Sequence, residues 1–408
     1  MFKEKIMGNA KEYYSKLLVF SASAGAIGLV VGAITALFGR VLIAITTYRE
    51  MHAFYLLPFL AFIGLIIVYS YQKYGKNTAK GMGLVFAVGN NEEEVIPKRM
   101  IPLVIMGTWL THLFGGSAGR EGVAVQIGAV VGHSVSRQLP YKEAGKILLV
   151  AGMAAGFGGL YQTPLAGIFF AIEVLMVGKI ESRALIPTAI AAFTASTTSH
   201  LLGLEKFTAT IESPGAFIFS SAWKVILLGL VFGIVGGLFA FGLKKAKQLA
   251  AFRFPDPYKR IFFIGIAISL LFLLLHSGRY SGLGTNLIGK SFETGTIYSY
   301  DWVLKLMLTI VTLAAGFQGG EVTPLFAIGA TLGIALAPIV GLPLTFAAAL
   351  GYIALFAAAT KTFMGPLFIG VEVFGYQYLP FFFIVVITAY VFNGNQTIYG
   401  GQKEIDWV

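Results

Sequence analysis

The sequence contains no cysteine and few charged residues. The missing cysteine excludes disulfide bonds, thiolate nucleophiles and cysteine-ligated iron–sulfur clusters. Asp, Glu, Lys and Arg together make up 12% of the 408 residues, whereas a typical soluble domain has about 25%. So few charges could not cover the surface of a soluble protein of this length. The high apolar content also excludes a disordered chain.

Apolar residues are correspondingly abundant, at 57% of the chain, and the mean hydropathy is +0.79. Leu17–Gly39 contains no charged residue and is long enough to span a bilayer, which takes about 20 residues. Several other runs are shorter and interrupted by Gly or Pro, which is typical of the broken helices of transporters. None alternates as the strands of a β-barrel would, so the sequence predicts an all-α polytopic membrane protein. After Ala53–Ser70, the further runs are 101–114, 122–136, 146–158, 163–178, 184–202, 223–243, 261–276, 302–316, 322–340, 345–359, 362–374 and 377–393.

The formal net charge is +11. In a membrane protein, the excess of Lys and Arg in cytoplasmic segments explains such a charge, so no nucleic-acid partner is expected. The basic stretches are the leader Met1–Lys16, Arg137–Lys146 and Lys244–Arg260, all predicted to be cytoplasmic, whereas Leu204–Ser221 is predicted to be external. Without a long linker, the chain is interpreted as one transmembrane transport domain over 1–408, with no soluble regulatory domain.

A weak internal repeat divides the chain. GREGVAVQIGAVVG (119–132) aligns with GEVTPLFAIGATLG (320–333) at a shift of 201, with five of 14 positions identical. IFFAIEV (168–174) aligns with LFIGVEV (367–373) at a shift of 199. Two matches at nearly one shift predict two related, inverted halves, at roughly 17–202 and 223–400.

The stretch GGSAGREG (115–122) carries charge into a glycine-rich, apolar environment. Glycines such as Gly122 let the backbone approach a ligand, and the following helix start favours an anion. Glu121 would bring its own negative charge to the same place, so a carboxylate and a free anion would compete there. Protonation of Glu121 would admit the anion and couple the two ions. The alternative is that Arg120 and Glu121 form an ion pair at the membrane edge.

Three further positions could line an ion pathway. Met82 and Gly83 form a glycine-flanked turn before an apolar segment, although plain packing is the alternative there. Glu321 and Thr323 bring polar side chains into an apolar region, or simply cap a helix. Tyr399 offers a hydroxyl donor just beyond the last span, or belongs to an interfacial tyrosine belt.

Other polar residues allow more than one functional interpretation. GGSAG (115–119) matches the G-x-S-x-G pattern of hydrolases, but a serine hydrolase needs a base close to Ser117. His112, five residues upstream, is a candidate, and the five histidines of the chain lack the close spacing of metal ligands. Glu173 and Glu372 occupy nearly matching places in the two halves and could be helix-end or interface charges.

Four motifs in combination resemble the CLC chloride channel and transporter family: GSAGREG (116–122), AGMAAGFGGLYQTPLAGIFFAIEV (151–174), GGEVTPLFAIGATLG (319–333) and NGNQTIYGG (393–401). The resemblance implies a homodimer with one anion pathway in each subunit, antiparallel halves, and anion sites at the ends of broken helices. It also implies that Glu121 is the gating glutamate and that Tyr399 faces the anion. Val322 and Thr323 match the segment whose backbone amides approach the anion.

The departures from the family pattern are informative. Met82 replaces an anion-facing serine and Val123 replaces a proline. Val174 stands where chloride/proton exchangers of the family carry an internal proton-handling glutamate, and Glu321 replaces an aliphatic residue. Together these look like the fluoride-transporting branch of the family.

The expected function is therefore fluoride/proton antiport in a bacterial inner membrane, with fluoride, protons and lipid as partners and no cofactor, metal or enzymatic activity. Glu121 is expected to be the proton-coupled gate, assisted by Glu321 and Thr323, with Met82, Gly83, Gly122, Val322 and Tyr399 around the anion. A chloride- or nitrate-selective transporter or channel is the alternative.

Overall fold

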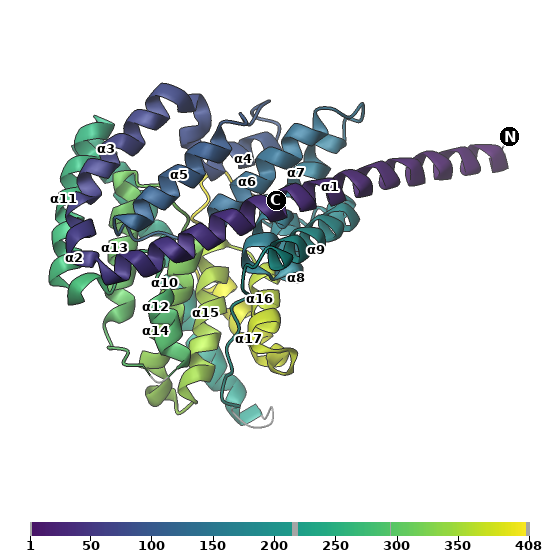
Figure 1. The fold of residues 1–408 in the computed structure, drawn as a ribbon. Coiled ribbons are helices and arrows are strands. Elements are labelled where there is room, and N and C mark those ends of the chain that lie inside the picture. The colour runs from purple at the N-terminus through teal and green to yellow at the C-terminus, as the bar shows by residue number, and fades with distance from the viewer. Residues whose placement is uncertain (1, 214–218, 294, 405–408) are drawn as a thin grey trace.

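One helix of 50 residues, α1 (Phe2–Met51), opens the chain and crosses one side of a helical bundle in the computed structural model (Figure 1). The structure describes residues 2–213, 219–293 and 295–404. The predicted boundary between a leader and a span at Leu17 is not seen, because nothing between Phe2 and Met51 breaks a helix: the segment has no proline. The N-terminal part of α1 extends away from the bundle.

The first half continues with helices of very different length. The α-helices after α1 in this half range from 4 residues in α2 to 18 in α7, and α4, which starts at Met82, has 8 residues. The described α-helices and strands after α1 are α2 (Ala53–Leu56), α3 (Leu60–Ser70), α4 (Met82–Gly89), α5 (Met100–Leu113), α6 (Glu121–Ser136), α7 (Ala144–Tyr161), α8 (Pro164–Glu173), the strand β1 (Met176–Val177) and α9 (Leu185–Leu201). The predicted run 163–178 is wrong at its end, because α8 stops at Glu173 and β1 follows.

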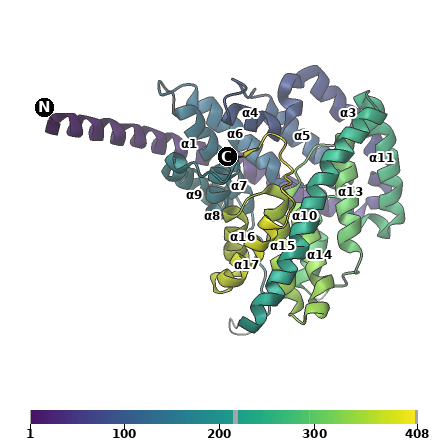
Figure 2. The same ribbon diagram turned by 180° about the vertical axis from the view of Figure 1, so that it is seen from behind.

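The second half begins with α10 (Phe219–Arg253), which crosses the side of the bundle opposite to α1 (Figure 2). The basic residues from Lys244 to Arg253 lie on the last turns of this helix rather than in a loop. The remaining elements are α11 (Pro257–Leu274), α12 (Thr285–Phe292), α13 (Asp301–Ala315), α14 (Val322–Val340), α15 (Leu344–Thr360), α16 (Met364–Phe374), α17 (Leu379–Val391) and the strand β2 (Lys403–Glu404), which pairs in parallel with β1.

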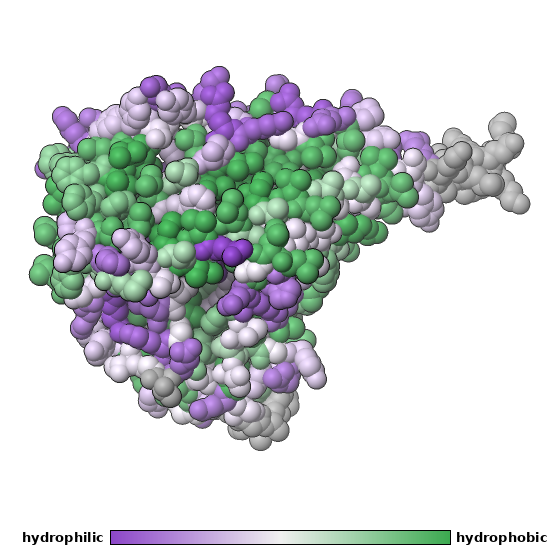
Figure 3. Space-filling view, viewed as in Figure 1, coloured by the Kyte–Doolittle hydropathy of each residue, from purple (hydrophilic) through white to green (hydrophobic). Residues whose placement is uncertain are grey.

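The surface matches a bilayer environment. A broad apolar band crosses the molecule between polar residues above and below it (Figure 3). Six of the described helices, among them α7 and α14, are long and apolar enough to cross a membrane. The chain is therefore an all-α, multi-pass membrane protein, as the composition predicts.

The two halves meet at a short antiparallel bridge between Gly119 and Gly320. Each glycine donates its N–H to the carbonyl oxygen of the other. These are the two positions that the sequence repeat aligns at a shift of 201. A residue that pairs with its own counterpart is what a two-fold relation between inverted halves would produce.

Glycine lines the tightest helix crossings. A Cβ atom on Gly152 of α7 would overlap the carbonyl oxygen of Gly128 on α6, and the reverse also holds. Gly329 of α14 and Gly351 of α15 repeat this arrangement in the second half. Small residues allow such close backbone approach in membrane helices, and here they hold α6 and α14, the helices that start at the two repeated motifs.

Glu173 and Glu372 cap helices of opposite halves. Glu173, at the end of α8, accepts the N–H groups of Met364 and Gly365 at the start of α16, with N···O distances of 3.0 and 2.8 Å. Glu372 of α16 accepts the N–H of Ala166 in α8 at 2.9 Å. Both are therefore helix-end charges. Each accepts N–H groups from the first turn of the other helix, which have no partner within that helix, and these bonds join α8 to α16.

Candidate functional site

Glu121 is the first residue of α6, and its side chain is fully buried. Its carboxylate reaches across to the other half of the protein. The Thr323 hydroxyl lies 2.6 Å from Oε2 and 2.8 Å from Oε1, and the Thr323 N–H donates to Oε2 at 3.0 Å. A further N–H, that of Arg120, approaches Oε2 at 3.3 Å.

The position of this carboxylate differs from the sequence expectation in one respect. It was expected at the start of its own helix, α6, but its shortest contacts are to the start of α14. Thr323 is the second residue of α14, whose first-turn amides have no intrahelical partner. Such a helix start stabilises negative charge, so Glu121 occupies a place suited to an anion.

Arg120 contributes a weaker contact. Its Nε lies 3.6 Å from Glu121 Oε1 and has no hydrogen-bond partner in the described structure. The ion pair that the sequence offered as an alternative is therefore present. It accompanies the contacts with Thr323 and does not replace them.

Glu321 precedes α14 and faces a different direction from Glu121. Its nearest basic group is Lys247 on the last turns of α10, with an Nζ···Oε1 distance of 3.9 Å. Glu321 is 14% exposed and Lys247 is 49% exposed. The described contacts thus link Glu321 to the basic end of α10, whereas Thr323 holds Glu121.

The remaining predicted residues surround this point. Val322, the first residue of α14, is buried, and a Cβ on Gly122 would lie 3.5 Å from the Gly320 Cα. Tyr399 is buried, and its ring centroid lies 5.2 Å from that of Phe86.

Met82 and Gly83 start α4, the helix that carries Phe86 and packs against α6 and α7. Met82 is partly buried, and a Cβ on Gly83 would meet no atom within 4 Å. Gly83 is exposed, so its open surroundings lie at the surface of the molecule. No direct contact between Met82 and Glu121 is described, and the described contact between α4 and Tyr399 is made by the Phe86 ring.

Ser117 has a structural role. It is fully buried, and its Oγ contacts Thr309 Oγ1 at 2.8 Å and Lys305 Nζ at 2.9 Å. The ring nitrogens of His112 face the carbonyl oxygens of Thr108 and Ala118 instead. His112 is therefore not placed to act as a base for Ser117, whose hydroxyl is held by Thr309 and Lys305. Among the described residues, no three His, Asp or Glu side chains gather to hold a metal ion.

Lys305 is a fully buried charged residue to which the sequence analysis assigns no role. Its buried ammonium donates to Ser117 Oγ and to the carbonyl oxygens of Tyr280 and Gly282, at 2.9, 3.1 and 2.7 Å. It thereby fixes the loop that leads to Glu121. A single lysine inside an apolar segment is itself a functional signal and could have identified it.

Replacing Thr323 with valine tests the carboxylate contact. The variant keeps the backbone N–H but removes the hydroxyl, and a hydrogen bond to a charged group contributes about 1.5–3 kcal/mol. We expect the occupancy of the Glu121 position seen here to fall roughly tenfold or more. Under the fluoride/proton exchange that the family resemblance implies, fluoride would then pass without protons. Parallel fluoride and proton flux measurements in liposomes would show fewer protons moved per fluoride.

Thr331→Val is the matched control, because Thr331 lies on the same helix and its hydroxyl donates only within α14, to Ala327 and Ile328 carbonyl oxygens. Equal coupling ratios in the two variants would show that the Thr323 hydroxyl does not hold the gate.

Comparisons with known proteins show which family this chain resembles. The sequence profile of the voltage gated chloride channel family matches residues 63–394. A chloride/fluoride channel protein of Pseudomonas syringae pv. tomato is 36% identical over 392 residues, which is 94% of this chain and 86% of that protein.

Solved structures extend the likeness to three dimensions. The crystal structure of a CLC-type fluoride/proton antiporter superposes with a TM-score of 0.94 at 50% identity, covering 96% of this chain and 99% of that chain. A slow cyanobacterial chloride/proton antiporter shares the fold, with a TM-score of 0.80 at 20% identity over 93% of this chain and 96% of that chain.

Proposed function

We propose that this chain, which belongs to the voltage gated chloride channel family, exchanges fluoride for protons across a bacterial inner membrane. The observation that carries the proposal is the Glu121 carboxylate bound to the N–H and hydroxyl of Thr323 at the start of α14. A titratable group here occupies donors that a free anion could use.

The exchange follows from competition for these donors. While ionised, Glu121 fills the position and excludes an anion. Protonation removes its negative charge and weakens its charge-assisted hydrogen bonds, so the carboxyl group leaves and fluoride takes over the donors. Fluoride is small and a strong acceptor, which suits the Thr323 and Val322 backbone amides and the Tyr399 hydroxyl.

The proton needs its own route to Glu121. Val174 carries no titratable group, and its carbonyl oxygen accepts the Gln402 amide at 3.0 Å. Glu121 must therefore collect its proton by moving itself or through other groups. Glu321, whose Oε1 lies 3.9 Å from Lys247 Nζ at the basic end of α10, is the candidate for such a group.

The choice of fluoride rests on relatives and on the departures from the family pattern. The Pseudomonas relative is a chloride/fluoride channel protein, and the solved structure that shares 50% identity is that of a CLC-type fluoride/proton antiporter. This chain also differs from the chloride/proton exchangers of the family at Met82, Val174 and Glu321, and these differences favour fluoride as the anion. We expect Met82 and Gly83 to line the anion route, and two copies to form a homodimer.

The physiological use is export. Fluoride enters a cell as the weak acid HF and is trapped as the anion. Inward proton flow through this protein would drive the trapped fluoride out.

Anion selectivity tests the proposal. Purified protein in liposomes loaded with fluoride or with chloride should release fluoride at least tenfold faster than chloride, as read by ion-selective electrodes. Equal release of the two anions would favour the alternative, a chloride transporter or channel of the same fold. Protein-free liposomes provide the leak control.

A further inference from the structure

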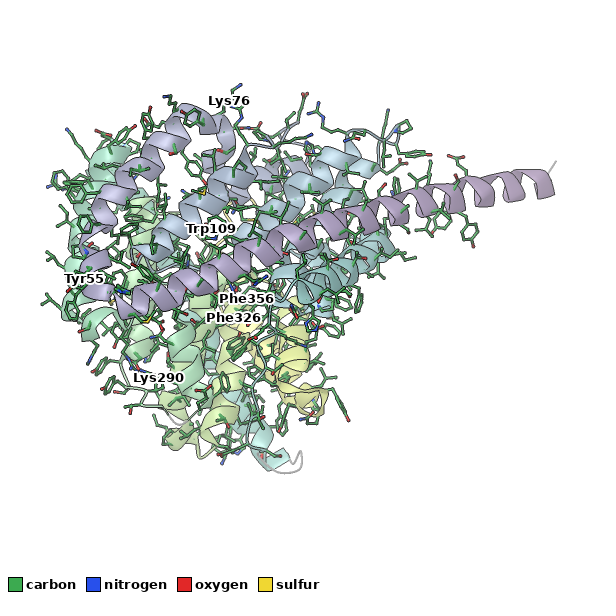
Figure 4. The ribbon with its side chains drawn as sticks, viewed as in Figure 1. Tyr55, Lys76, Trp109, Lys290, Phe326 and Phe356 are labelled. Atoms are coloured by element: carbon green, nitrogen blue, oxygen red, sulfur yellow. The ribbon has the colours of Figure 1, made fainter. Side chains whose placement is uncertain are left out.

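A polar pocket of about 360 Å³ lies at the end of α1 that is opposite to its leader. The last residues of α1 and Ala53 form one wall, and Tyr298 together with residues of the segment from His276 to Lys290 forms the rest. Figure 4 places Lys290 on the side of the molecule opposite to Lys76. None of the residues that line the pocket belongs to the Glu121 site.

Arg49 forms the inner wall of the pocket. Its side chain is only 2% exposed, and one guanidinium nitrogen donates to the His112 carbonyl oxygen at 3.2 Å. The other approaches Glu50 at 3.5 Å, a long contact to a half-exposed carboxylate. A buried guanidinium with this little pairing retains donors for a ligand that reaches the pocket.

Two more basic side chains line the pocket, and only one of them is paired with a carboxylate. Arg279 is already neutralised by Asp301 through contacts of 2.6 and 3.1 Å, and it stacks over the ring of Tyr298. Lys290 is exposed and has no described ion pair or hydrogen bond, so its ammonium is free to move onto a ligand. Glu50 also lines the pocket and offsets one positive charge, so that Arg49 and Lys290 together leave the pocket with a net positive charge.

The level of the pocket in the membrane is marked by exposed aromatic residues. Phe54, Tyr55 and Phe59 follow Arg49 directly and are 65%, 76% and 53% exposed. Figure 4 shows Tyr55 at the edge of the molecule, on the same side as Lys290. Among these, Tyr55 is of the type that is enriched at the boundary between acyl chains and headgroups, which is where lipid phosphates are found.

We propose that this pocket binds a phosphate group, with Arg49 and Lys290 as its main contacts. A guanidinium recognises two phosphate oxygens with parallel N–H donors, and a lysine ammonium adds a mobile point charge. The pocket is far larger than a fluoride ion. The phosphate comes either from an anionic lipid headgroup or from free phosphate in solution.

Occupation would stabilise the region that leads to the gate. Ser281, which lines the pocket, packs against Gly115, and the Gly282 N–H approaches the Gly115 carbonyl oxygen at 3.4 Å. Lys305 joins the same loop to Ser117. A bound phosphate therefore raises the temperature at which this part of the protein unfolds.

The experiment measures binding and stability, and it is independent of transport. Purified protein in detergent is given inorganic phosphate, phosphatidylglycerol or, at equal ionic strength, chloride. The unfolding midpoint is recorded, and lipid retention is read by native mass spectrometry. We expect a midpoint several degrees higher with a phosphate-bearing ligand than with chloride, and at least threefold less retained ligand in Lys290→Gln. Arg49→Lys keeps the charge but loses the two parallel N–H donors of the guanidinium, so this variant should also bind the ligand more weakly.

Lys224→Gln is the control, because Lys224 is a partly exposed lysine of the second half that donates to the Gly341 carbonyl oxygen outside the pocket. An effect of phosphatidylglycerol alone identifies a lipid headgroup as the ligand, and an effect of inorganic phosphate alone identifies free phosphate. If neither raises the midpoint above chloride, or if Lys290→Gln responds as fully as Lys224→Gln, the pocket is not a phosphate site.

Discussion

Glu121→Gln is expected to abolish fluoride-driven proton pumping, with a loss of at least 100-fold. Glutamine matches the shape of glutamate but cannot release a proton, so it cannot alternate between filling the α14 donors as an anion and leaving them. Its amide also brings an N–H group toward the Thr323 N–H and hydroxyl, where the carboxylate oxygens now accept at 3.0 and 2.6 Å. Proton uptake into liposomes under an outward fluoride gradient measures the effect.

The matched control for this variant is Glu92→Gln. Glu92 is exposed and pairs with Lys403 at the surface, with a distance of 2.7 Å, so its replacement should leave pumping unchanged. Both variants should elute from size-exclusion chromatography as the parent protein does. A Glu121→Gln variant that still moves protons against their gradient would refute the role assigned to this carboxylate.

Gly152→Ala is expected to destabilise the protein severely, by about 3 kcal/mol or more. The added methyl group would overlap the Gly128 carbonyl oxygen on α6, and backbone cannot move aside as a flexible side chain can. The helices would have to separate, which would also displace Glu121 at the start of α6. The unfolding midpoint and the yield of monodisperse protein report the change.

Gly145→Ala, on the same helix α7, is the control. A Cβ there would meet no atom within 4 Å, and alanine favours a helix over glycine by about 1 kcal/mol. This variant should be as stable as the parent protein or more so. Equal midpoints for the two alanine variants would show that the α6–α7 crossing has more room than the structure indicates.

Element boundaries were predictable where local signals are strong. The predicted run 322–340 coincides with α14, since Pro324 suits the start of a helix and Gly341, with φ 64°, ends it. Short helices were harder. α12 has only 8 residues and a mixed sequence, so hydropathy did not reveal it. The division of α1 into leader and span failed because charge changes along a helix without interrupting it.

The site was predictable in its residues but not in its contacts. Glu121 and Thr323 lie 202 residues apart, and only the repeat indicated that their motifs correspond. That the motifs also touch, through Gly119 and Gly320, depends on how the halves pack. Lys247 was assigned to a loop and so could not be paired with Glu321, whereas the structure places it on the last turns of α10.

Proton movement driven by fluoride tests the central claim most directly. Liposomes that contain the purified protein and a high internal fluoride concentration would be placed in fluoride-free buffer, with the interior more acidic and the membrane voltage clamped. The proposed exchange predicts that protons enter against their gradient as fluoride leaves, and that both fluxes stop together when the fluoride gradient is gone. Fluoride release with no proton uptake would contradict it and identify a passive anion pathway instead.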